Sequence, residues 1–207
     1  LSVVADAVTT PYQAILRSGL ADGDLAVFVG AGGVGGFGVQ IASALRAAVV
    51  AIDVHQERLE LLASHGASLT LRPDLVELKE LRRRVRDFAA ARRIPSWRWR
   101  IFETSGTPGG QSTAFALLGP GSHLSVVGFT LEKVEIRLSN LMALDATAQG
   151  NWGCLPEHYP AALDLVLSGK VALSPFVERR PLSSINETFA DLRARRTSKR
   201  VILVPEA

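Results

Sequence analysis

VFVGAGGVGGFGV, residues 27–39, is the stretch that decides the fold, because an apolar run ends there in the pattern Gly30-x-Gly32-x-x-Gly35. Glycines at this spacing allow a tight turn after a strand, close approach of the backbone to a pyrophosphate, and close packing of a helix on a sheet. The unpaired amide groups at the start of that helix favour a bound anion. The motif therefore predicts a dinucleotide-binding turn. A glycine-rich turn in an α/β protein without a nucleotide is the alternative.

The residues after the turn strengthen this interpretation. Apolar and small side chains recur at helical spacing from Val34 to Leu45, and a second apolar run covers residues 48–52. That run ends in Asp53, close to the roughly 20 residues past the last glycine at which a ribose-binding acid is expected. A carboxylate there accepts hydrogen bonds from the adenosine ribose and repels a 2′-phosphate, which favours NAD over NADP.

Segments typical of strands and helices alternate along most of the chain. The predicted strands cover residues 25–29, 48–52, 68–71, 101–103, 122–127 and 146–150. The predicted helices cover residues 9–17, 34–45, 56–64, 75–92 and 110–118, the first of them capped by a threonine hydroxyl. This alternation predicts an α/β fold, a doubly wound parallel six-stranded sheet of the Rossmann type with strand order 3-2-1-4-5-6.

The pattern changes after Gly150. Helices are predicted at residues 157–167 and 185–195, separated by an irregular stretch at residues 175–181. A closing apolar strand is predicted at residues 201–204, with no partner evident in the sequence. The apolar edge strand at residues 146–150 suggests pairing with another subunit, so we expect a homo-oligomer.

Composition limits the class of protein. The chain has 207 residues, 47% of them hydrophobic and 21% charged, which is typical of a globular protein. Its single cysteine, Cys154, excludes an internal disulfide and a cysteine-rich zinc site built from this chain alone. No apolar run approaches the roughly 20 residues that span a bilayer, and no leader peptide opens the sequence. We therefore expect a cytoplasmic protein without a membrane segment.

Basic residues are clustered although the net charge is only +3. The clusters include Arg82, Arg83, Arg84 and Arg86, then Arg92, Arg93, Arg98 and Arg100, and finally Arg193, Arg195, Arg196, Lys199 and Arg200. Nucleic-acid binding is one interpretation of such clusters. The first cluster lies on a predicted amphipathic helix, where a solvated helix face is the simpler explanation. We expect no nucleic-acid partner, and attraction for an acidic small molecule is the remaining option.

The strings GAGGVG, DAVTTPY and KRVILV, together with Asp53, give the chain a wider resemblance. It resembles the medium-chain, zinc-dependent alcohol dehydrogenases over essentially its whole length. The resemblance implies an oxidoreductase that transfers hydride to NAD, with zinc as a second cofactor. Family members also have an N-terminal catalytic domain that holds most zinc ligands, and nothing in these 207 residues corresponds to it. It implies that residues 1–20 lead in from that domain, that residues 21–155 bind NAD, and that residues 156–207 form C-terminal helices and a return strand.

Three longer strings imply a substrate within that family. RIFETSGTPGGQSTAF, VVGFTLEKVEIRLSNLMALDATAQGNWGCLPEHYP and PFVERRPLSSINETF are most similar to family members that act on an alicyclic acyl-CoA. The implied reaction is oxidation of the secondary alcohol of 6-hydroxycyclohex-1-ene-1-carbonyl-CoA to a ketone, in anaerobic benzoyl-CoA degradation. Two alternatives stay open: a non-catalytic NAD-binding module or fragment, and a zinc-free, quinone-reductase-like member.

The resemblance also assigns roles to individual residues. Asp6 stands where the family places a cysteine ligand of the catalytic zinc, and a carboxylate can replace a thiolate there. An ordinary surface or helix-capping aspartate is the alternative. Thr10 and Val34 would lie near the nicotinamide, or be a cap and a core residue. The other implied cofactor-binding residues are Gly30, Gly32, Gly33, Gly35, Asp53, Arg58, Ser105, Gly106, Val127, Gly128, Phe129, Asn151, Trp152 and Arg200.

Overall fold

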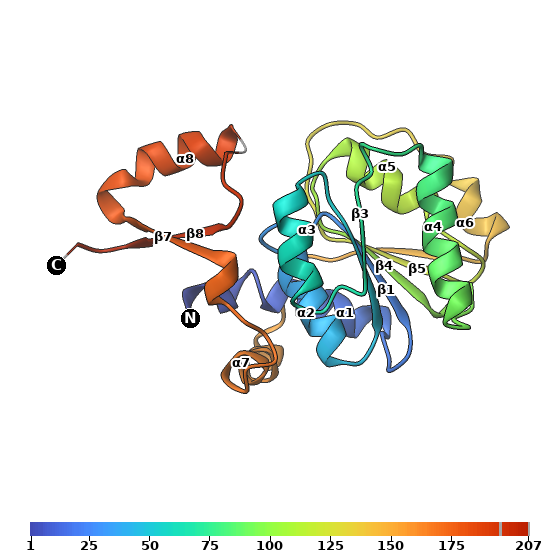
Figure 1. Ribbon diagram of the computed structural model, residues 1–207, viewed down its shortest axis with the longest axis horizontal. Coiled ribbons are helices and arrows are strands. Elements are labelled where there is room, and N and C mark those ends of the chain that lie inside the picture. The colour runs from blue at the N-terminus through green and yellow to red at the C-terminus, as the bar shows by residue number, and fades with distance from the viewer. Residues whose placement is uncertain (195, 207) are drawn as a thin grey trace.

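A parallel sheet forms the centre of the computed structural model, which describes residues 1–194 and 196–206 (Figure 1). Its six strands lie in the order β3-β2-β1-β4-β5-β6, and every neighbouring pair is parallel. The strands are β1 (Leu25–Val29), β2 (Ala48–Ile52), β3 (Leu69–Leu71), β4 (Trp99–Glu103), β5 (His123–Val126) and β6 (Thr147–Gly150). The predicted fold class and strand order are confirmed.

Helices cover both faces of this sheet (Figure 1). They are α1 (Thr9–Ser18), α2 (Gly35–Ala44), α3 (Gln56–Ala63), α4 (Leu78–Ala91), α5 (Pro108–Ala116), α6 (Ser139–Ala143) and α7 (Tyr159–Leu167). A further helix, α8 (Ile185–Arg193), lies to one side of this sheet (Figure 1). Single turns of 3-10 helix lie at Ser2–Ala5, Ser96–Arg98, Pro156–His158, Ser174–Phe176 and Leu182–Ser184.

Two hydrophobic cores follow from the alternation of side chains along the strands. Phe28 of β1 points to the face covered by α1, α2 and α3, whereas its neighbours Val27 and Val29 point to the face covered by α4 and α5. Successive residues of a strand face opposite sides, so a strand covered on both faces reads as a continuous apolar run. This is why the five residues of β1 are all buried.

The C-terminal part differs from the prediction. The stretch at residues 175–181, predicted to be irregular, contains strand β7 (Val177–Pro181). β7 pairs in parallel with β8 (Arg200–Val204), so the closing strand has a partner after all. Together with α8, the two strands lie to one side of the main sheet (Figure 1). The sequence did not predict β7 because Glu178, Arg179 and Arg180 are charged, so this strand is not an apolar run.

Several element boundaries also differ. α1 has no side-chain cap, so the predicted threonine cap is wrong; the Thr10 hydroxyl donates to Asp6 instead. α4 begins at Leu78, three residues later than predicted, and α6 was not predicted at all. α8 ends at Arg193, and Arg195, the predicted last residue of this helix, lies outside the described residues.

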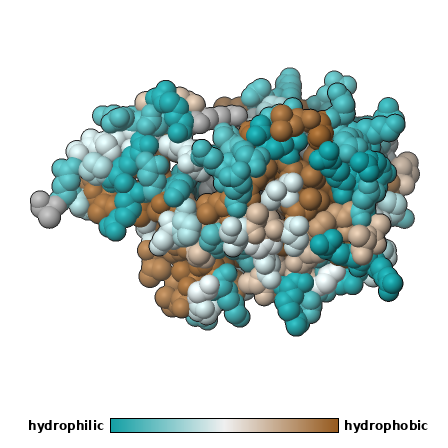
Figure 2. All heavy atoms as spheres, viewed as in Figure 1, coloured by the Kyte–Doolittle hydropathy of each residue, from teal (hydrophilic) through white to brown (hydrophobic). Residues whose placement is uncertain are grey.

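The arginines of α4 lie on a hydrophilic surface. Figure 2 shows hydrophilic residues over this helix, and apolar residues gathered lower in the view, near α7. Glu80 accepts hydrogen bonds from Arg83 and Arg84, both at 2.8 Å from the arginine Nε atoms. The hydrogen bonds from Arg83 and Arg84 lower the pKa of Glu80 to about 2. These contacts support the interpretation of a solvated helix face. No helix in the part of the chain that the structure describes is long and apolar enough to cross a membrane.

Candidate functional site

The glycine turn lies between the carboxyl end of β1 and the start of α2, and each of its glycines meets a different constraint. Gly30 has a φ of +97°, which other residues rarely adopt, and a Cβ there would overlap with Ser105. A Cβ on Gly35 would overlap with the carbonyl oxygen of Gly30, so this glycine allows helix and strand to pack closely. A Cβ on Gly32 would meet only the guanidinium of Arg58, at 3.7 Å. The turn is therefore crowded behind Gly30 and Gly35 and open above Gly32.

Asp53 is bonded directly to this turn. It follows β2 and is buried, and its Oδ2 accepts a hydrogen bond of 2.7 Å from the Ala31 amide. Its Oδ1 accepts a hydrogen bond of 2.9 Å from the His55 amide, and the His55 ring nitrogen lies at the same distance. Arg58 adds a positive charge 3.7 Å from Oδ1. The structure thus brings the predicted acid and the predicted glycine turn together.

Two further loops end at the same edge of the sheet. The loop after β4 contains Ser105, which lies against Gly30, and Gly106, which has a φ of +63°. The loop after β5 contains Gly128, where a Cβ would overlap with the Gly106 amide. The backbone of Phe129 comes close to Gly106, and Phe129 is 70% exposed. Phe129 is not among the residues that line the two cavities beside the glycine turn.

A cavity of about 300 Å³ opens beside these loops. It brings together seven of the predicted site residues, Asp6, Thr10, Val34, Val127, Gly128, Asn151 and Trp152. It is also lined by Thr104 and Gly153. Thr104 belongs to the loop after β4, which the sequence predicts to face a ligand. Gly153 was not predicted, and only its place next to Trp152 in the sequence pointed to it.

Among the described residues that line this cavity, Asp6 is the one acid. Its Oδ1 accepts a hydrogen bond of 3.1 Å from the Thr10 hydroxyl, and its Oδ2 forms an ion pair of 2.8 Å with Arg200. Nearby, Asn151 is buried and accepts a bond of 3.1 Å from Arg17, whereas Trp152 is 87% exposed. Both carboxylate oxygens of Asp6 thus already have partners within the chain.

A second, much smaller cavity of about 20 Å³ lies over the glycine turn. It is lined by Ala31, Gly32, Gly33, Arg58, Leu61, Phe176, Ser198, Lys199 and Arg200. Arg58 donates to the carbonyl oxygens of Ser198 and Thr197, at 3.1 and 3.0 Å, and so holds the C-terminal segment over the turn. Leu61, Phe176 and Ser198 were missed because they are far from the motif in sequence and of ordinary types.

The residues present do not form a complete metal site. No three His, Cys, Asp or Glu side chains within residues 1–194 and 196–206 lie close enough to hold a metal ion together. Asp6 alone offers one carboxylate. Its role as a zinc ligand stays a prediction.

Comparisons with known proteins agree with this geometry. Residues 33–168 match the model of a family described as zinc-binding dehydrogenase. The chain is 25% identical over 189 residues to galactitol 1-phosphate 5-dehydrogenase of Escherichia coli K12, covering 86% of this chain and 53% of that protein. It is 28% identical over 197 residues to an alcohol dehydrogenase of Geobacillus stearothermophilus, covering 94% of this chain and 54% of that protein.

A solved structure shows the same similarity in three dimensions. The crystal structure of an alcohol dehydrogenase from Thermotoga maritima matches with a TM-score of 0.89 and 28% identity. That match covers 100% of this chain and 57% of the other. The chain thus spans about half the length of the curated relatives that it matches.

Proposed function

The chain belongs to the family of zinc-binding dehydrogenases, and on this premise we propose that it binds NAD as the cofactor-binding part of an alcohol dehydrogenase. One observation carries the proposal: Asp53 accepts the amide of Ala31 inside the glycine turn, at the carboxyl edge of a doubly wound sheet. Dinucleotides bind at this edge in such sheets, where the strand order reverses. The strand order reverses at β1: β2 and β3 are added on one side of it, and β4, β5 and β6 on the other.

The proposed cofactor position follows from the two cavities. The adenosine ribose would meet Asp53, with Arg58 beside the adenosine. The pyrophosphate would lie over Gly32 and Gly33 at the start of α2, where backbone amides favour an anion. Arg200, next to Gly33, would donate to it. The nicotinamide would enter the larger cavity, close to Thr10, Val34 and Val127.

When bound, NAD would accept the hydride from the carbinol carbon of a secondary alcohol, while the hydroxyl proton would go to water, giving a ketone and NADH. The chain's own residues would position the cofactor for this step and keep water from the ring. Asp6 is the only described acid in the larger cavity, so a zinc site would need ligands from beyond these residues.

We propose 6-hydroxycyclohex-1-ene-1-carbonyl-CoA as the alcohol, with residues 21–155 as the NAD-binding domain and residues 156–207 as the tail. The similarity of the three long sequence strings supports this substrate. Turnover of that thioester by the full-length enzyme, compared with galactitol 1-phosphate and a simple alcohol, tests it. A preference for either of the other alcohols would overturn the substrate proposal and leave the NAD proposal intact.

NADH binding to this chain tests the cofactor proposal directly. We expect NADH to bind more tightly than NADPH, and Asp53→Asn to weaken NADH binding about tenfold and reduce that preference. Asp87→Asn is the matched control, because Asp87 pairs with Arg83 on the exposed face of α4, away from the glycine turn. A folded chain that binds neither nucleotide would overturn the proposal. Nucleotide binding without hydride transfer in the full-length enzyme would support a non-catalytic module.

A further inference from the structure

Glu103 is a buried carboxylate to which no role has yet been assigned. It is the last residue of β4 and only 1% exposed, and it directly precedes the loop that contains Ser105 and Gly106. A buried charged group is costly unless it is paired or hydrogen-bonded. The hydrogen bonds of the Glu103 carboxylate therefore indicate which part of the structure it stabilises.

One of its two carboxylate oxygens holds the loop after β4. Oε1 accepts hydrogen bonds from the Ser105 amide at 2.9 Å and from the Ser105 hydroxyl at 2.6 Å. It also accepts the Gly106 amide at 3.2 Å. Three donors from two consecutive residues converge on one atom, and this fixes the path of the loop where Gly106 adopts its left-handed conformation.

The same residue also holds the loop after β5. The backbone carbonyl oxygen of Glu103 accepts the amides of Val127 and Gly128, both at 2.9 Å. A Cβ on Gly128 would lie 2.6 Å from Oε2, so the second loop packs directly on the carboxyl group. Glu103 is thus the point at which the two loops beside the larger cavity meet.

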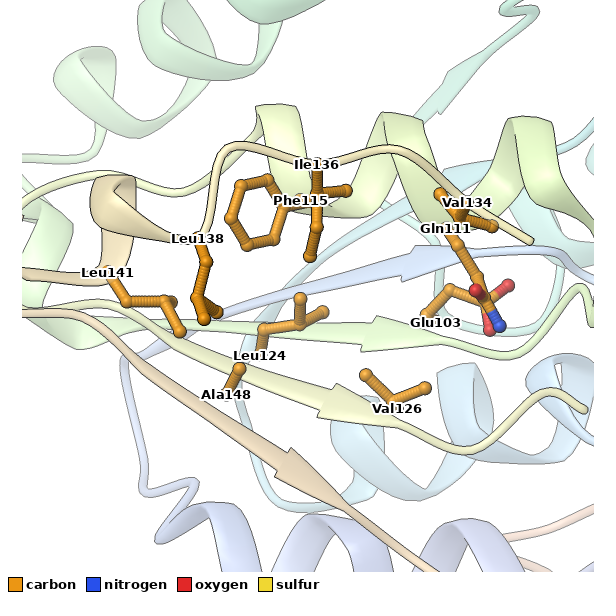
Figure 3. A pocket seen from close by; sticks show the side chains of 10 residues that line it. All are labelled: Glu103, Gln111, Phe115, Leu124, Val126, Val134, Ile136, Leu138, Leu141 and Ala148. Carbon is orange, nitrogen blue, oxygen red and sulfur yellow. The ribbon is translucent and has the colours of Figure 1, made fainter.

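The other carboxylate oxygen is different. Oε2 is buried and has no hydrogen-bond partner among the residues that the structure describes. Glu103 lines a cavity of about 290 Å³ between β5 and α5, where the remaining lining is apolar except for Gln111. Figure 3 shows Glu103 and Gln111 together at one end of this cavity and the apolar side chains along the rest. Of the two carboxylate oxygens, only Oε1 therefore forms hydrogen bonds that order the loop after β4.

We propose that Glu103 is a positioning residue for the cofactor, and that it acts as a hydrogen-bond acceptor at Oε1 rather than through its negative charge. The inference rests on the proposed NAD binding, because the two loops would contact the cofactor. A glutamine at this position can place its amide oxygen where Oε1 lies and its NH₂ where Oε2 lies. An aspartate keeps the charge but is shorter by one methylene, so it withdraws the acceptor from the loop.

Two substitutions in the 207-residue chain separate position from charge. We expect Glu103→Gln to bind NADH within about twofold of the unmodified chain, and Glu103→Asp to bind about tenfold more weakly. The control is Asp24→Asn, a change at another buried carboxylate that holds a loop, at the opposite, amino end of β1. Asp24 accepts from Arg98 at 2.6 Å and from the Ala21 amide at 2.9 Å. Its variant should lower the unfolding temperature without changing the NADH Kd.

Each outcome decides the inference. Loss of NADH binding in Glu103→Gln with retention in Glu103→Asp would show that the charge matters, and equal loss in both would show that an acceptor at Oε1 is not sufficient; either result would overturn the inference. Equal loss in the Asp24 variant would show a purely structural role. A chain that binds no NADH would contradict the proposed function instead. In that case hydrogen exchange at the Ser105 and Gly106 amides decides: Glu103→Asp should speed it about tenfold and Glu103→Gln should not. Unchanged exchange in both variants would overturn the inference.

Discussion

The glycines of the turn have separate physical tasks, although they look equivalent in the sequence. A Cβ on Gly35 would overlap with the Gly30 carbonyl and the Thr104 hydroxyl, whereas a Cβ on Gly32 would meet only the guanidinium of Arg58, at 3.7 Å. Crowding against backbone cannot be relieved by rotating a side chain, but crowding against a guanidinium can. Folding and ligand binding therefore depend on different glycines.

Alanine substitutions test this separation. Gly35→Ala should lower the free energy of unfolding by about 3 kcal/mol, because an added methyl overlaps with backbone. Gly32→Ala should change it by less than about 1 kcal/mol while weakening NADH binding at least tenfold, because the methyl occupies the proposed pyrophosphate position. Urea unfolding and NADH titration measure the two quantities. Similar stability losses in both variants would contradict the assignment.

A histidine at the opposite edge of the sheet makes stability depend on pH. Burial, with smaller contributions from Arg100 and Arg17, lowers the pKa of His123 below its ordinary value of about 6.5. As pH falls through that value, the unfolded chain takes up the proton before the folded chain does, so unfolding is favoured. Stability should therefore decrease between pH 7.5 and 5.5, and His123→Gln should flatten this decrease in thermal unfolding. If stability falls with pH equally steeply in the variant, the pH dependence comes from other groups.

At the scale of elements, Gly38 is a second position at which α2 packs closely against β1. A Cβ on Gly38 would overlap with the ring of Phe28, which stacks on Phe102 with ring centroids 4.6 Å apart. Gly38→Ala should thus destabilise the protein by about 1–3 kcal/mol despite the higher helix propensity of alanine. Adding Phe28→Leu to Gly38→Ala should recover part of the lost free energy of unfolding, because the smaller side chain leaves room for the methyl group. A double-mutant cycle by urea unfolding measures the coupling, and simple additivity would refute direct packing.

The sequence predicted the main sheet because buried parallel strands are continuous apolar runs, as β1 and β2 are. It failed at β7, which carries charged residues: Arg180 there pairs with Glu178 and Asp191, both at 2.7 Å. Asp53 and the glycine turn were predictable because a local motif specifies them. Phe176 and Ser198 were not, because only the tertiary fold brings these ordinary residues to the turn. Glu103 was missed for a similar reason, since its partners are mostly backbone amides.

At the scale of the whole molecule, apolar side chains remain exposed in the segment that precedes the edge strand β6. Leu131, Leu138 and Met142 are 91%, 68% and 76% exposed. Exposed apolar side chains and an unpaired strand edge each favour association, so we expect a homo-oligomer. Leu138→Glu with Met142→Glu should shift the mass in analytical ultracentrifugation to that of the monomer. Leu167→Glu on α7, at a residue 66% exposed, should not. A monomeric unmodified chain would contradict the expectation.

The ion pair between Asp6 and Arg200 joins residues from the two ends of the sequence. A ribosome synthesises the sheet, the glycine turn and Asp53 long before Arg200 emerges from its exit tunnel. The larger cavity therefore acquires its last charged contact only when translation of this region is nearly finished. Because the pair is partly exposed, it adds little to stability. A nascent chain stalled before residue 200 should consequently be folded over most of the sheet, and yet lack the guanidinium that neutralises Asp6.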